Sequence, residues 1–313
     1  MPLPSRIHGK SVPRRMHEFM GGLAADLGVD SYALFGGTPL DTYLDPDAPL
    51  HDVDIALRAT PGQLEALTSS LLRSGYEIVE WGRQYFINLT EEVLIVLARK
   101  NDLLLDVNVL DDLSLIGQFD LETLKCRYPQ MEYEDGHDAL GALERRTAKT
   151  VRDPAGENPY LLLTRLITLA AKYRLELAAD ALHQGYIDDL NARIGIWKYG
   201  NEFHDEKAPA GHCSSVLRSI LRAGDRLAFV NDLTRSGALS ETIPELHGLL
   251  SGAGADDSAP LLEATTKEDL GLAIIKLLPP EGRQQFARRL GGLRARLWEQ
   301  SDLSLAERTS AYR

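Results

Sequence analysis

The sequence contains few cysteines and no disulfide or zinc-binding pattern. Cys126 and Cys213 are the only two cysteines among 313 residues, and neither has a CxxC or Cys/His ligand spacing nearby. This distribution excludes a disulfide framework and a zinc site of the usual kinds. We therefore expect two reduced, structural thiols.

Long apolar runs are also missing, and positive charge is in deficit. No stretch reaches the roughly 18 to 20 consecutive apolar residues that cross a bilayer, and residues 1–15 lack the apolar segment of a secretory signal. We expect a cytoplasmic protein with no membrane partner. The formal net charge is −12, from 46 acidic and 34 basic residues. Such a charge repels phosphate backbones unless basic residues gather on one face, which weighs against indiscriminate nucleic-acid binding.

The chain is long enough for two hydrophobic cores, and its pattern changes near residue 120. We predict an α+β chain, with a small mixed-sheet domain over 1–120 followed by an all-helical domain over 121–313. Strand-like runs occupy 31–35, 52–57, 77–81, 84–90, 92–98 and 103–110, with a helix at 61–73. Apolar residues at helical spacing predict helices at 160–182, 186–198, 214–234, 258–278 and 281–300.

Two carboxylates share one face of the predicted strand 52–57. Asp52 and Asp54 are two residues apart, and successive strand side chains alternate between faces. Side by side, the two carboxylates repel each other unless a cation lies between them. Hard oxygen ligands on a rigid strand suit Mg²⁺, which keeps water and substrate phosphates as its other ligands. A D-x-D pattern alone is common by chance, so its context decides.

A glycine turn precedes this strand. Gly36, Gly37 and Thr38 follow strand 31–35, where glycine amides and the Thr38 hydroxyl can approach phosphate oxygens without a Cβ in the way. Without the carboxylates, an ordinary Gly-Gly turn would be the better interpretation. Arg83 and Lys100 are further candidates for triphosphate binding, since phosphates favour multidentate cations, although a residue of this kind is more often a solvated loop cation.

A third carboxylate interrupts the apolar run 103–110. A lone buried Asp106 would be costly without a cation or hydrogen-bond donors nearby, so we predict that it completes a carboxylate triad. There it would bind metal and act as the base toward an acceptor hydroxyl. Asn108, on the same face, could support it. The alternative is a strand-end aspartate bonded to the backbone.

The segment FGGTPLDTYLDPDAPLHDVDIAL over 35–57 resembles the head domain of the DNA polymerase β nucleotidyltransferase superfamily. It is most similar to bacterial tRNA CCA-adding enzymes and poly(A) polymerases. The shared features, in chain order, are Gly36, Gly37, Asp41, Asp52 and Asp54. The resemblance implies a palm-like domain, two Mg²⁺ ions, a nucleoside triphosphate substrate, and transfer of a nucleoside monophosphate with release of pyrophosphate.

Two departures from this family bear on the acceptor. Leu40 stands where an arginine usually precedes Asp41, and no arginine-rich, aspartate-containing motif is evident over 111–150. With the acidic net charge, these departures favour a small-molecule or protein acceptor. The alternatives are an RNA 3′ end, as in CCA-adding enzymes or poly(A) polymerases, and a non-catalytic nucleotide-binding regulatory module. The nucleotide transferred and the oligomeric state stay open.

Overall fold

The chain divides into two compact units, Met1–Glu157 and Asn158–Arg313. The computed structural model describes residues 6–59, 61–84, 93–109, 117–151, 158–177, 181–200, 207–252 and 259–290. The predicted domain boundary at residue 120 falls inside the first unit, because two strands that follow it pair with strands that precede it. The predicted succession of a mixed-sheet part and a helical part is confirmed.

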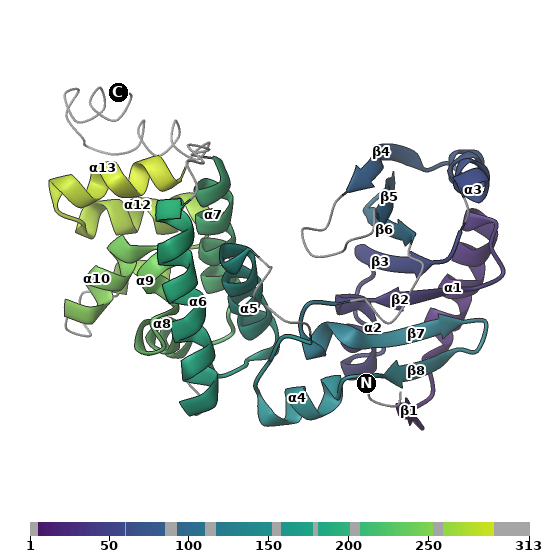
Figure 1. Ribbon diagram of the computed structural model, residues 1–313, viewed down its shortest axis with the longest axis horizontal. Coiled ribbons are helices and arrows are strands. Elements are labelled where there is room, and N and C mark those ends of the chain that lie inside the picture. Colours follow the sequence, from purple (N-terminus) through teal and green to yellow (C-terminus); the bar gives the residue numbers. More distant parts are fainter. Residues whose placement is uncertain are drawn as a thin grey trace. The chain divides into compact units, whose positions relative to one another are not determined.

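An eight-stranded mixed sheet forms the first unit, in the order β1-β8-β7-β2-β3-β6-β5-β4 (Figure 1). The strands are β1 Arg6–His8, β2 Tyr32–Phe35, β3 Asp52–Leu57, β4 Glu77–Gln84, β5 Val93–Lys100, β6 Leu103–Val109, β7 Leu124–Tyr128 and β8 Glu132–Asp135. β3 and β6 pair in parallel, and the other neighbours are antiparallel. β3 thus lies in the interior of the sheet, between β2 and β6.

Helices cover one face of this sheet. The helical segments are α1 Arg14–Leu27, α2 Gly37–Leu44, α3 Pro61–Arg73, the 3₁₀ turn η2 Asp120–Thr123, and α4 Ala139–Arg145. α1 and α3 pack against each other, as Figure 1 shows in purple and blue. Leu34 and Ile55, which pair across β2 and β3, are fully buried, and Cys126 beside Leu34 contacts Met20 of α1. The face of β3 that carries Ile55 is therefore the one that α1 covers.

Two strand predictions differ from the structure. Gly82 and Arg83, predicted as a turn, continue β4 because their backbone pairs with Ile95 and Leu94 of β5. The predicted strand 84–90 lies almost wholly outside the described residues. β7 and β8 were not predicted. LKCRY alternates apolar and polar residues but is only five residues long, EYED is four residues long with a single apolar side chain, and both strands are stabilised by pairing with β2 and β1.

The second unit is helical in all its described parts. It comprises α5 Pro159–Tyr173, α6 Ala181–Gly200, α7 Lys207–Arg222, α8 Arg226–Arg235, α9 Ala238–Thr242, α10 Pro244–Gly252, α11 Ala259–Glu263, α12 Lys267–Leu277 and α13 Pro280–Arg289. Two predicted helices are each divided by an N-cap. Asp225 accepts a bond from the Ala228 N–H at 3.0 Å and starts α8, and Thr266 starts α12 with a capping box.

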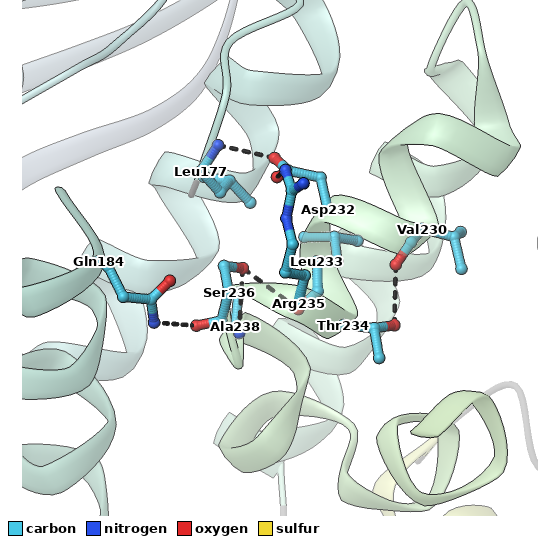
Figure 2. Close-up of polar contacts among 9 residues, drawn as sticks. All are labelled: Leu177, Gln184, Val230, Asp232, Leu233, Thr234, Arg235, Ser236 and Ala238. Atoms are coloured by element: carbon cyan, nitrogen blue, oxygen red, sulfur yellow. Dashed lines mark hydrogen bonds and ion pairs between the residues drawn. The ribbon is translucent and has the colours of Figure 1, made fainter. Parts of the chain in front are cut away.

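The Asp232 carboxylate connects two segments of the helical unit. It accepts the Leu177 N–H at 2.7 Å and pairs with Arg235 at 2.9 Å, so it connects α8 to the chain that follows α5 (Figure 2). Gln184 of α6 donates to the Ser236 carbonyl at 2.9 Å. The end of α8 is thus held by the Leu177 backbone N–H, from the chain between α5 and α6, and by the Gln184 side chain of α6.

Both cysteines are buried and free of disulfides, as predicted. Among the helices that the structure describes, none is long and apolar enough to cross a membrane.

Candidate active site

The three predicted carboxylates lie on one face of two neighbouring strands. The parallel register of β3 and β6 places Asp54 directly opposite Asp106, with Asp52 opposite Leu104. Residues paired in this way point to the same side of a sheet. Since Val53 and Ile55 occupy the face that α1 covers, the carboxylates lie on the other face. Asp52 is exposed, and Asp54 and Asp106 are half-buried.

Asp106 is in an environment that disfavours its negative charge. Burial raises the pKa of Asp106, and the negative charges of Asp52 and Glu80 raise it further. The Asn108 amide opposes this shift by donating to Asp106 Oδ1 at 3.0 Å. A cation bound between Asp52 and Asp106 would relieve their repulsion.

This donor set suits Mg²⁺ only if the substrate contributes ligands. Across the described residues, no group of three or more His, Cys, Asp or Glu side chains forms a ready metal cage. Mg²⁺ in phosphoryl-transfer sites is commonly held by one or two carboxylates together with substrate phosphates and water. The oxygen-only chemistry of this face fits that mode of binding, in which the nucleotide completes the coordination.

Gly36 joins the turn directly to this carboxylate face. Its φ of 70° lies in the left-handed region, and a Cβ there would come within 2.1 Å of Asp54 Oδ2. Its N–H donates to the Glu122 carbonyl at 3.3 Å. Only glycine therefore fits this position. The Gly36 N–H was predicted to bind phosphate, but it already donates its hydrogen bond to a backbone carbonyl.

The backbone donors suited to phosphate are therefore those of the next two residues. Gly37 and Thr38 open α2, and the first N–H groups of a helix have no intrahelical acceptor. Helix N-termini also carry partial positive charge, which favours phosphate groups. Pro39 has no N–H, so Gly37 and Thr38 supply the donors of the first turn.

The Thr38 side chain has a different partner from the predicted one. Its hydroxyl donates to the Asp52 carbonyl at 3.1 Å, and the residue is only 5% exposed. The hydroxyl thus fastens the start of α2 to the start of β3. The prediction assigned the Thr38 hydroxyl to phosphate, whereas the Thr38 backbone N–H is the group suited to that contact in the structure.

Of the two predicted cations, Lys100 does not join the carboxylate face. Lys100 pairs with Leu103, which places it on the side opposite Asp106, and its Nζ lies 5.0 Å from the centre of the Tyr76 ring. This position contradicts the predicted contact with triphosphate. Arg83 lies in β4 rather than in a turn, and its side chain is outside the described parts.

Sequence reasoning missed three charged residues on this face, and one of them, Glu77, is the β4 partner of Arg99. Arg99 pairs with Leu104 and so shares the face of Asp106, a placement that depends on the register of β5 with β6. Glu80 pairs with Leu97, the residue opposite Asp106. It reaches this face because the register shifts between Ile78 and Glu80, and that irregularity leaves no signal in the sequence.

The turn η2 supports the glycine turn from its other side. Glu122 Oε2 accepts the N–H groups of Gln118 and Phe119, each at 3.1 Å. These bonds shape the turn whose Glu122 carbonyl meets Gly36. Beside it, Asp120 is 1% exposed and accepts the Leu121 and Lys149 N–H groups at 2.9 and 3.2 Å. No motif in the sequence pointed to this segment.

A glycine turn that opens a short helix, followed by a strand with two carboxylates beside a third, occurs here on a fold shared with solved CCA-adding enzymes. Solved CCA-adding enzymes and tRNA nucleotidyltransferases are the structural neighbours of this chain. The predicted resemblance is therefore confirmed at the level of the fold.

Three of these structures span most of both chains. A tRNA-processing enzyme in an apo form has a TM-score of 0.56 at 15% identity and covers 93% of this chain and 79% of its own. A CCA-adding enzyme in complex with CTP has a TM-score of 0.57 at 11% identity, and the match covers 92% of this chain and 72% of that enzyme. The Thermotoga maritima CCA-adding enzyme complexed with tRNA has a TM-score of 0.56 at 10% identity, and the match covers 100% of this chain and 73% of that enzyme. No family model matches this sequence, and no curated protein matches it. Identities this low establish the fold alone.

Proposed function

We propose that this chain is a magnesium-dependent nucleotidyltransferase that moves a nucleoside monophosphate from a nucleoside triphosphate to an acceptor, with release of pyrophosphate. The observation that carries the proposal is the register of β3 and β6, with Asp54 opposite Asp106 and Asp52 on the same face. The glycine turn supports it, because Gly36 packs directly against the Asp54 carboxylate.

The residues divide the reaction between them. The N–H groups of Gly37 and Thr38 bind phosphate oxygens of the triphosphate. The acceptor oxygen attacks the α-phosphorus and forms a new P–O bond, while the bond to the β-phosphate oxygen breaks and pyrophosphate leaves. Asp106 takes the proton from the acceptor hydroxyl, a role that suits a carboxylate whose pKa is raised by burial.

Asp52, Asp54 and Asp106 would hold Mg²⁺ together with the triphosphate. When bound, the two ions lower the pKa of the attacking hydroxyl and neutralise the charge of the leaving pyrophosphate. The three carboxylates also repel acceptors of negative charge near the α-phosphate, so metal and nucleotide must bind for the acceptor to approach.

For the acceptor, we favour a small molecule or a protein. The net charge of −12 and the presence of Glu80 on the carboxylate face both disfavour a polyanion. An RNA 3′ end is the second candidate, because solved structures of the same fold are described as complexes with tRNA.

Labelled nucleotides test this proposal. The protein is incubated with Mg²⁺ and each of the four α-labelled triphosphates, with total tRNA, with a metabolite extract, or with neither. Label transfer and pyrophosphate are followed for the wild type and for Asp54→Asn. Asp102→Asn is the matched control, because it removes one exposed carboxylate from the β5–β6 turn that is not among the three proposed ligands.

We expect transfer that Asp54→Asn lowers by at least about a hundredfold and Asp102→Asn leaves unchanged. Label in tRNA would establish the RNA acceptor, and label that moves only with the extract would establish a small acceptor. Nucleotide binding without carboxylate-dependent transfer would instead support a non-catalytic regulatory module, and the proposal would then be rejected.

A further inference from the structure

Asn108 is the polar neighbour that contacts the third carboxylate most directly. It lies two residues after Asp106 on β6, between Ile95 of β5 and Ala56 of β3. Its side chain is 5% exposed, so the amide is almost fully removed from water. A buried amide of this kind needs defined partners, because each unmade hydrogen bond costs about 1 to 3 kcal/mol.

Asp106 supplies those partners twice. The Asn108 Nδ2 donates to Asp106 Oδ1 at 3.0 Å and to the Asp106 backbone carbonyl at 3.2 Å. The amide of Asn108 therefore donates hydrogen bonds to both the side-chain carboxylate and the backbone carbonyl of Asp106. This pair of bonds fixes the direction of the Asp106 side chain relative to β6, and it commits Oδ1 to Asn108.

From this geometry we infer that Asn108 is a positioning residue, which holds the Asp106 carboxylate in the orientation that binds metal beside Asp54. The inference rests on the proposed function, since it concerns the same site. Free carboxylates rotate about their side-chain bonds, whereas ligands that are oriented by a hydrogen bond bind metal more tightly. Loss of such an orienting partner typically costs about 10 to 100-fold in metal affinity or activity.

The alternative is that Asn108 only fills space in the sheet. Two matched substitutions separate these roles. Asn108→Leu keeps the approximate volume of the side chain and removes the amide. Asn191→Leu makes the same change in α6, where the Asn191 amide donates to the Gly237 carbonyl at 2.9 Å and no carboxylate ligand is involved.

The readout is binding of Mn²⁺ in the presence of a non-hydrolysable nucleoside triphosphate analogue, followed through the electron paramagnetic resonance of free Mn²⁺. We expect Asn108→Leu to weaken Mn²⁺ binding roughly 10 to 100-fold and Asn191→Leu to leave it unchanged. In the transfer assay, raising the metal concentration should restore part of the activity of Asn108→Leu but none of that of Asp106→Ala. A structural role alone would not produce this metal-dependent recovery.

The outcomes separate this inference from the proposed function. Wild-type Mn²⁺ affinity in a folded Asn108→Leu protein would overturn the positioning role and leave the nucleotidyltransferase proposal standing. A wild-type protein that binds no Mn²⁺ with any triphosphate analogue would overturn both. If Asn108→Leu fails to fold, Asn108→Thr replaces it, because threonine keeps a short donor and a β-branched side chain suited to a strand. Unchanged affinity in that variant, whose shorter donor cannot make both contacts, would likewise reject the positioning role.

Discussion

Gly36 meets two separate steric demands, and each can be tested against another glycine. Both Gly36 and Gly75 have positive φ, at 70° and 84°, but a Cβ at Gly75 would meet nothing within 4 Å, whereas one at Gly36 would strike Asp54. Alanine at Gly75 therefore measures the backbone cost alone, about 1 to 2 kcal/mol.

We expect Gly36→Ala to weaken triphosphate binding by tenfold or more, on the order of 1.4 kcal/mol of binding free energy. Gly75→Ala should lower the melting temperature without changing nucleotide affinity. Fluorescent nucleotide titration and thermal unfolding of both variants check this. Equal nucleotide affinity in the two variants would show that the contact between Gly36 and Asp54 has no part in binding.

Asp120 gives a pH dependence of stability with a definite sign. Burial raises the pKa of Asp120 to about 6 in the folded protein, while backbone N–H donors partly oppose the shift. The folded state therefore holds a proton that the unfolded state, with a pKa of about 3.9, has already released. Its contribution to stability is complete below pH 4 and is lost as the pH rises through 6.

The loss should amount to about 2 to 3 kcal/mol between pH 4 and pH 7.5. Asparagine at this position cannot ionise, and its oxygen can still accept from Leu121 and Lys149. Urea unfolding of wild type and Asp120→Asn across this range should show a difference in stability that grows in favour of the variant as the pH rises. Parallel curves would mean that Asp120 is ionised throughout.

Among the helical elements, Arg226 donates hydrogen bonds to backbone carbonyls at the ends of two other helices, α7 and α11. Its guanidinium donates to the carbonyl of Leu262 near the end of α11, to that of Ala264 just after this helix, and to that of Leu221 in α7. Carbonyls at helix C-termini have no intrahelical donors, so one planar cation satisfies groups that would otherwise be left unpaired.

Arg226→Gln should therefore destabilise the helical unit by about 1 to 3 kcal/mol, since hydrogen bonds to charged groups are among the stronger ones. Arg222→Gln, an exposed change four residues earlier in the last turn of α7, should cost less than about 0.5 kcal/mol. Denaturant unfolding followed by circular dichroism compares the two. Similar values would mean that the carbonyl contacts of Arg226 are replaced by water without loss.

The elements that the sequence predicted well are those with strong local signals. Strand 52–57 and helix 61–73 match the structure, because strict alternation and a proline start identify them. The breaks at Asp225 and Thr266 lie inside continuous apolar periodicity, where a cap competes with helix continuation and only packing decides. Lys100 was misplaced for another reason: its face depends on the register of β5 with β6, which residue type does not reveal.

At the scale of the whole chain, net charge makes a prediction about the acceptor. A protein of charge −12 that binds RNA through several phosphate contacts should lose affinity steeply with salt, by roughly 10³ to 10⁵ between about 50 and 200 mM for 6 to 10 contacts. A neutral or cationic small acceptor depends on salt much less.

We therefore expect the KM for the acceptor to change less than about tenfold over that salt range. The KM for the triphosphate, measured in the same experiments, is the internal control for effects of salt on the site itself. A steep rise of the acceptor KM, with the triphosphate KM constant, would favour the RNA 3′ end instead.

The irregular register of β4 has a consequence that concerns chain length rather than residue type. Val79 is the extra residue between Ile78 and Glu80. Because of it, each later side chain of β4 points to the face opposite the one that regular alternation would give it. Deleting Val79 would remove the irregularity and leave Glu80 directly after Ile78, still opposite Leu97 and still on the carboxylate face. The loss of one residue at this point of the edge strand can thus be absorbed without changing the charge around Asp106, whereas a deletion elsewhere between Glu80 and Gln84 would shift the residues after it to the other face.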